Sequence, residues 1–192
     1  DGTALDQDKW NYEDDCWGGG NAERQCYTQK TENVEIANGL LTIRAIKEKT
    51  RGFANTRAAR DGEVSLAPGT KRYARVRRPF SSGRIVSRGK GDWTYGRFEA
   101  RMKLPTGQGL WPAFWMLPSD YAYGGWAASG EIDIMDAINL GMTCETCEGG
   151  REDRVYGTLH YGGRWPDNEY SGANVPVPAP VDGFHTYTVE WS

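Results

Sequence analysis

Residues 130–136, with the sequence GEIDIMD, place three carboxylates among apolar residues that should be buried. A buried carboxylate is costly unless it is paired, hydrogen-bonded or used in chemistry. If the segment is a β-strand, Glu131 and Asp133 share one face and the isoleucines between them point to the other, because side chains alternate along a strand. The segment therefore predicts an acidic surface on one face of a sheet.

Asp136 does not fit this alternation. In a regular strand Met135 would share the acidic face and Asp136 would point into the core. One inserted residue, a β-bulge at Ile134–Met135, returns Asp136 to the acidic face, and bulges are common where a side chain must be re-aimed. We therefore predict a bulged strand with three carboxylates along one face.

This arrangement of carboxylates suits retaining glycoside hydrolysis. That reaction needs a carboxylate nucleophile and a carboxylic acid about 5–5.5 Å apart. Glu131 and Asp136 are the outer pair, and Asp133 between them can hydrogen-bond the nucleophile, while mutual repulsion keeps one group protonated. Two alternatives stay open. The first is that the acids bind a divalent metal ion, although their spacing does not match an EF-hand loop. The second is that they are purely structural.

Aromatic residues are unusually abundant, with 8 Trp and 10 Tyr. An indole ring offers a large flat apolar face with one polar edge, which suits the C–H face of a sugar ring, although core packing should account for about half of them. His160, at the end of a predicted strand, either faces the carboxylates or is a structural residue. The tryptophans nearest the acidic segment in sequence are Trp111, Trp115, Trp126 and Trp165.

Length and charge restrict the class of protein. The 192 residues suffice for one domain with a sizeable core, and the net charge of −3 argues against a nucleic-acid partner. No apolar run approaches the roughly 18 residues of a membrane span. The polar start of the chain shows no signal pattern, so a targeting segment is absent or has been removed.

The four cysteines allow three full pairings. A redox motif at Cys144–Cys147 would need a βαβ context, and a zinc site would need a second close ligand pair; neither is evident. We expect two local disulfides of an exported protein, Cys16–Cys26 and Cys144–Cys147.

Short strands dominate the predicted structure. Helical periodicity is poor, Asn38-Gly39 predicts a hairpin within residues 33–45, and residues 95–103 alternate cleanly between apolar and charged side chains. The glycine content, nearly double the average of roughly 7%, fits many turns. The pattern indicates an all-β sandwich or barrel. Further strands are predicted at residues 83–87, 110–117, 131–135, 155–161 and 185–191.

Two segments are predicted to be loops. Residues 47–78 are rich in Lys and Arg and lack periodicity, which indicates a long surface loop or poorly ordered insertion, with a polyanion-binding patch as the alternative. Residues 170–183 carry Pro176, Pro178 and Pro180 and should run extended over the surface.

The sequence also resembles glycoside hydrolase family 16, specifically the bacterial laminarinase-like endo-β-1,3-glucanases. This resemblance implies a β-jelly-roll sandwich of two curved antiparallel, concanavalin A-like sheets, with a glucan cleft on the concave face. The matching stretches are NAERQCYT (21–28), SGRIVSRGKGDWTYGRFEARMKLPTGQGLWPAFWMLP (82–118), GGWAASGEIDIMDAINL (124–140), VYGTLHYGGRWPDN (155–168) and FHTYTVEWS (184–192).

The resemblance assigns roles to individual residues. It implies that Glu131 is the nucleophile, that Asp133 orients and tunes it, and that Asp136 is the acid/base. The implied substrate-binding residues are Trp111, Trp115 and Trp126, which would stack on glucose rings, Asn21, Glu23 and Arg84, which would meet sugar hydroxyls, His160, which would support the catalytic strand, and Trp165.

From the resemblance we expect endo-hydrolysis of β-1,3-glucosidic bonds in laminarin-type glucans by a retaining double displacement. It implies no required cofactor, allows a structural Ca²⁺, and implies a monomer, without nucleic-acid or membrane partners, that is secreted, periplasmic or on the surface of a bacterial cell. Alternatives are a non-catalytic or weakly catalytic β-glucan-binding protein, or an enzyme for agar, carrageenan or mixed-linkage glucan.

Two departures from the family pattern shape these expectations. The acid/base position is usually Glu, and Asp136 is one methylene shorter; a misplacement on the order of 1 Å can cost about a hundredfold in rate. The chain also begins after the usual first strand and stops at VEWS, where relatives continue. We therefore expect residues 1–192 to be a single catalytic domain that is partial and incomplete at the C-terminus.

Overall fold

A computed structural model describes residues 2–177 and 183–192. These residues form short β-strands, one helix and one 3₁₀ turn, so the predicted all-β class is confirmed. Within them no helix is long and apolar enough to cross a membrane. The chain divides into two compact units, Asp1–Asp92 and Trp93–Ser192, and each is described by itself.

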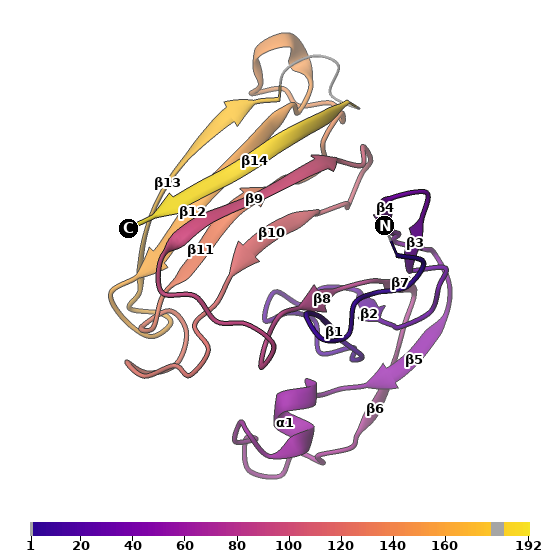
Figure 1. Cartoon of the computed structure of the whole chain (residues 1–192), viewed down its shortest axis with the longest axis vertical. Helices are drawn as coiled ribbons and strands as arrows, with labels where there is room; N and C mark the ends of the chain where they lie inside the picture. The colour runs from indigo at the N-terminus through magenta and orange to yellow at the C-terminus, as the bar shows by residue number, and fades with distance from the viewer. Residues whose placement is uncertain (1, 178–182) are drawn as a thin grey trace. The chain divides into compact units, whose positions relative to one another are not determined.

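Paired strands build the first unit (Figure 1). The predicted hairpin at Asn38-Gly39 is confirmed: both residues have positive φ, 53° and 75°, as a type I′ turn requires. The β2–β7 pair is parallel and the others are antiparallel. The pairs are β1 (Asn11–Tyr12) with β8 (Ile85–Val86), β2 (Gln25–Tyr27) with β7 (Phe80–Ser82), β3 (Val34–Ala37) with β4 (Leu40–Ile43), and β5 (Thr50–Phe53) with β6 (Arg75–Arg78).

The prediction that residues 47–78 form a loop is wrong. They contain β5, the helix α1 (Arg57–Asp61) and β6. The Thr56 hydroxyl caps α1 by accepting from the Ala59 N–H at 3.3 Å, and Gly62 ends it at φ 91°. The two strands pair across a long connection, so no short turn marks them in the sequence.

The second unit holds a four-stranded antiparallel sheet and a strand pair (Figure 1). On β9 (Gly96–Lys103) the alternation is as predicted, with Phe98, Ala100 and Met102 partly buried and the charged residues exposed. The sheet order is β10 (Ala113–Met116), β11 (Glu131–Asp136), β12 (Arg154–Tyr161) and β13 (Glu169–Pro176), and the pair is β9 (Gly96–Lys103) with β14 (Phe184–Trp191).

Two strand predictions and one loop prediction need correction in extent. The strand predicted at 83–87 is only β8, Ile85–Val86. β10 is shorter than the predicted 110–117 and begins after Pro112, which has no N–H to donate to a ladder. The predicted loop 170–183 begins as part of β13, which pairs with β12 along its whole length. Every residue of β13 is exposed, so the strand carries no buried alternation that would reveal it. Pro178 and Pro180 lie outside the described residues.

One apolar cluster joins the two layers of the second unit. Met102 of β9 and Tyr187 of β14 pack with Phe114 of β10, Met135 of β11 and Val155 of β12. Because Met135 is 1% exposed, its side chain anchors β11 from the core side. The opposite face of β11 is thereby left to its polar residues.

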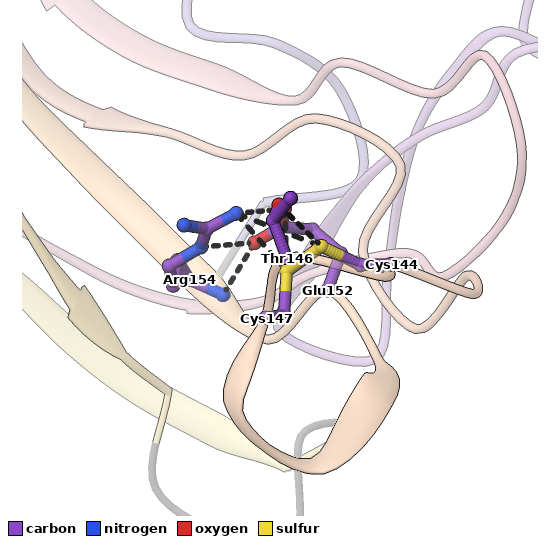
Figure 2. Close-up of a disulfide and its surroundings, with 5 residues drawn as sticks. All are labelled: Cys144, Thr146, Cys147, Glu152 and Arg154. Carbon is purple, nitrogen blue, oxygen red and sulfur yellow. Dashed lines mark hydrogen bonds and ion pairs between the residues drawn. A yellow bond between two sulfur atoms is a disulfide. The ribbon is translucent and has the colours of Figure 1, made fainter.

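Both predicted disulfides are present. Cys16–Cys26 lies against β5, where a Cβ on Gly52 would come within 2.7 Å of the Cys16 Sγ, so only glycine fits there. Cys144–Cys147 closes the connection between β11 and β12, and Figure 2 shows it beside Glu152 and Arg154.

The cysteines of that connection are not free to bind a metal ion. Cys144, Cys147 and Glu152 bring sulfur and oxygen atoms within 4.8 Å of one another. The sulfurs are bonded together, however, and Glu152 is occupied by Arg154, whose Nη2 lies 2.6 Å from Oε2 (Figure 2). The cluster therefore stabilises the connection between the two strands.

Candidate active site

The predicted β-bulge is present on β11. On the β10 side, Phe114 pairs with Met135 and Trp115 with Asp133, so Ile134 is passed over. On the β12 side the register also shifts between Asp133 and Asp136. With Met135 in the core, Asp136 joins the other two carboxylates on one face, as the sequence indicated.

Each of the three carboxylates lies against a different ring. The contacting ring atoms are all nitrogens, and an indole N–H can only donate a hydrogen bond. The structure thus brings two of the predicted tryptophans and the predicted histidine to the acidic face. The contacts are Trp126 Nε1 to Glu131 Oε2, Trp111 Nε1 to Asp136 Oδ1 at 3.0 Å, and His160 Nε2 to Asp133 Oδ2 at 3.2 Å.

Asp133 is the most buried of the three acids, with 6% of its surface exposed. Burial raises its pKa to about 7, and the charge and hydrogen bond of Glu131 add to the rise. His160 opposes the rise because a positive neighbour favours the carboxylate. Asp133 is therefore partly protonated near neutral pH and can then donate a hydrogen bond to Glu131.

Asp136 also has a raised pKa, of about 6, chiefly because of burial. The Trp111 N–H counteracts this by stabilising the carboxylate, while the negative charge of Asp133 adds to the rise. A carboxyl group with this pKa is partly protonated near pH 6. It can donate a proton to a leaving group and later accept one from water.

A row of rings crosses the sheet from these acids. The Trp126 and His160 ring centroids are 5.3 Å apart, and those of His160 and Tyr170 are 6.1 Å apart. Tyr170 is the cross-strand partner of His160 and is 73% exposed. Sequence reasoning missed Tyr170 because it lay in the predicted loop; recognising β13 as the partner of β12 would have placed it opposite His160.

Of the two remaining predicted tryptophans, Trp115 lies opposite an acid and Trp165 is joined to the Trp126 loop. Trp115 is the cross-strand partner of Asp133, and directly opposite residues share a face of the sheet. The backbone N–H of Trp165 donates to the backbone carbonyl oxygen of Trp126 at 3.2 Å, which joins their two loops, and the Trp165 side chain is 73% exposed. Trp111 and Trp126 are 46% and 36% exposed, so their rings are partly accessible to a ligand.

Three predicted substrate-binding residues lie in the first unit. The Tyr27 hydroxyl donates to Glu23 Oε2 at 2.9 Å, and the Arg84 guanidinium lies 5.6 Å from the Tyr27 ring centroid. Burial, followed by the Glu23 charge, raises the pKa of Tyr27 to about 12. Asn21 is in the preceding turn, with its N–H on the Gly18 carbonyl at 3.0 Å. Their contact with sugar stays a prediction.

Comparisons with known proteins show the family of this chain. The chain is 40% identical to glucan endo-1,3-beta-glucosidase A1 of Niallia circulans over 99% of its length and 25% of that protein, and 36% identical to a beta-glucanase of Rhodothermus marinus over 97% and 54%. The structure of the laminarinase from Rhodothermus marinus matches with a TM-score of 0.70 at 34% identity, covering 98% of this chain and 62% of that one.

The chain thus spans a quarter to about three fifths of these relatives. The likeness in structure and sequence makes the fold class the β-jelly roll. Residues 21–192 match the model of glycosyl hydrolases family 16, a match that runs through both compact units. The chain belongs to glycosyl hydrolase family 16.

Proposed function

We propose that the protein hydrolyses internal β-1,3-glucosidic bonds of laminarin-type glucans with retention of anomeric configuration. The observation that carries the proposal is the bulged strand β11, which puts Glu131, Asp133 and Asp136 on one face with a raised pKa for Asp136. The names of the relatives, a glucan endo-1,3-beta-glucosidase and a laminarinase, support the substrate.

The reaction takes two displacements. Glu131 attacks the anomeric carbon and forms a glycosyl ester, while Asp136 gives its proton to the departing glycosidic oxygen. Asp136, now a carboxylate, removes a proton from water, which attacks the same carbon and releases Glu131. The N–H of Trp126 on Glu131 and that of Trp111 on Asp136 hold the two carboxylates in place.

Asp133 and His160 position the nucleophile. Asp133 hydrogen-bonds Glu131 and is itself held by His160 Nε2 at 3.2 Å. When Glu131 becomes an ester and loses its charge, burial still favours the protonated form of Asp133. Hydrolysis therefore proceeds with the chain's own side chains and water, and we propose that no cofactor is required.

The rings on the acidic face would bind the glucan. Indole and phenol faces pack on sugar C–H groups, and their exposed fractions leave such faces open. We propose that residues 1–192 belong to one catalytic domain, since the family match crosses both units. Two disulfides fit an oxidising compartment, so we place the activity outside the cytoplasm.

Reducing-sugar release from laminarin tests the proposal, with agarose, κ-carrageenan and mixed-linkage glucan in parallel and Glu131→Gln as the control. We expect release from laminarin, loss of at least about a thousandfold in the control, and β-configured new ends by proton NMR at early times. Release that persists in Glu131→Gln, or α-configured first products, would overturn the assignment.

A second candidate is a glucan-binding protein with little hydrolysis. Its supporting observation is Asp136, shorter by one methylene than the usual glutamate and bonded at 3.0 Å to Trp111. Asp136→Glu separates the two candidates. A gain of about a hundredfold or more over an almost inactive native protein that still binds laminarin would establish the binding protein. An unchanged or lower rate would mean that Asp136 is a working acid.

A further inference from the structure

Two groups can be distinguished among the basic residues of the segment from β5 to β6. The first group serves the fold. Arg60 Nη1 donates to the Asn55 carbonyl oxygen at 2.7 Å, and Arg72 Nη1 donates to the Ala59 carbonyl oxygen at 2.8 Å, at the end of α1. Arg60 and Arg75 both lie over the Phe53 ring, at 4.1 and 4.5 Å from its centroid. These contacts explain why a segment so rich in arginine is folded.

The second group has no such use. Arg51 and Arg77 are directly opposite each other in the β5–β6 pair, and both are exposed. Like charges directly opposite in an antiparallel pair destabilise it. Neither guanidinium forms an ion pair with a carboxylate of the described residues. The fold thus holds two positive charges together without a counter-charge.

The positive charge continues next to Arg51. An open hollow of the first unit is lined by Lys30, Lys49 and Arg51, with Thr28, Gln29 and Thr50 between them. Asp14 is the one carboxylate in this lining, and Lys30 is paired with Glu48 at 3.0 Å. Lys49 and Arg51 therefore remain as cations beside hydroxyl and amide groups, which can hydrogen-bond neutral sugar hydroxyls.

We propose that this cationic face, Lys49, Arg51 and Arg77 with the hollow beside them, binds a polysaccharide that carries sulfate or carboxylate groups. A guanidinium fork matches the paired oxygens of either group, and two opposed forks fit successive anions on one chain. The hydroxyl and amide groups of the hollow, which can hydrogen-bond the many sugar hydroxyls of a polysaccharide, favour such a polymer as the occupant. Only the choice of a polysaccharide rests on the proposed function; the anion site does not.

The test compares Arg51→Thr/Arg77→Thr with Lys90→Thr/Lys103→Thr. Both variants lose two exposed charges. Threonine suits the strand positions Arg51, Arg77 and Lys103, and Lys90 lies in a turn. Without ligand, we expect the arginine variant to melt about 1–3 °C higher than the native protein, because the repulsion is removed. Its affinity for dextran sulfate or polygalacturonate should fall at least about tenfold. The lysine variant should match the native protein in both measurements.

The polymers separate the sources of the anion. Tighter binding of dextran sulfate indicates sulfate esters, and tighter binding of polygalacturonate indicates carboxylates; neutral dextran should not bind. Native affinity in the arginine variant, no rise in its melting temperature, or tighter binding of a DNA duplex than of either polymer would overturn the proposal. Hydrolysis of neutral laminarin tests the acidic face of β11. A protein without that activity would therefore still allow the anion-binding test of the cationic face.

Discussion

Strands β9 and β11 of the second unit both carry charges on one face, but their surroundings differ. On β9, Arg97 contacts Glu99, and its Nη1 lies 2.6 Å from Glu190 Oε1 of β14. These residues are exposed, and the hydrogen bond from Arg97 lowers the pKa of Glu99. On β11, burial raises the pKa values of Asp133 and Asp136.

The direction of the pKa shift therefore separates the two roles. On β9, opposite charges pair with each other in contact with water, which makes this a solvated outer face. On β11, three carboxylates gather and receive two neutral indole N–H groups and one imidazole. Such a cluster costs folding free energy and is typical of a reactive site. Substitutions on the two strands should consequently act on different properties.

The largest difference should come from Asp136→Asn. It removes the proton donor, so kcat/KM for laminarin should fall by about 10²–10⁴. In the native protein the reactive form has Asp136 protonated, so kcat/KM should be highest below pH 6 and fall as pH rises through about 6. The pH profile of the native protein and the residual rate of the variant check this. A native profile that stays flat between pH 5 and about 8 would contradict the assignment.

Tyr170→Ala should have a smaller effect, on binding. The exposed ring lies beside His160 at the outer end of the ring row, so its loss should raise KM for laminarin about three- to tenfold and leave kcat within about twofold. Tyr161→Ala is the matched control, because Tyr161 follows His160 on β12 and points to the other face. Equal effects of the two variants on KM would remove Tyr170 from the site.

Asp133→Asn should change stability in a pH-dependent way. The folded-state pKa of Asp133, about 7, lies above the ordinary aspartate value of 3.8. Its contribution to stability is therefore full below pH 3.8 and is lost as pH rises through 7. Asparagine avoids that loss. The variant should melt about 2–4 °C higher than the native protein at pH 8, for a gain on the order of 1 kcal/mol.

At pH 4 this difference should nearly vanish, because the native carboxyl group is then protonated. The variant should also be a slower enzyme, since stability and activity oppose each other at such sites. Melting curves at the two pH values test the idea. A variant that is less stable than the native protein at pH 8 would mean that Asp133 holds the fold together.

The sequence predicts β11 well because its constraints are local. In a regular strand Asp136 would point into the apolar core, which is unfavourable. A bulge at Ile134–Met135 avoids this, and the bulge is present. The hairpin at Asn38-Gly39 and the two short-range disulfides follow from neighbouring residues in the same way. Where a few adjacent residues fix the geometry, the prediction holds.

What the sequence did not predict depends on distant partners. β5 and β6 pair across a long connection, and Arg60 and Arg72 donate hydrogen bonds to carbonyl oxygens there. Tyr170 joins the site only through its cross-strand register with His160. The periodicity of a short segment cannot predict such long-range contacts, because they depend on which strands pair.

The smallest effect should come from Glu99→Gln, which tests the other side of the comparison. Arg97 keeps its contact with Glu190, and exposed ion pairs contribute little because water solvates both charges. The melting temperature should therefore change by no more than about 1 °C, and kcat/KM for laminarin by less than about twofold. A loss of activity approaching that of Asp136→Asn would show that charge on either strand matters to catalysis. The raised pKa values on β11 would then no longer distinguish its reactive face from the solvated face of β9.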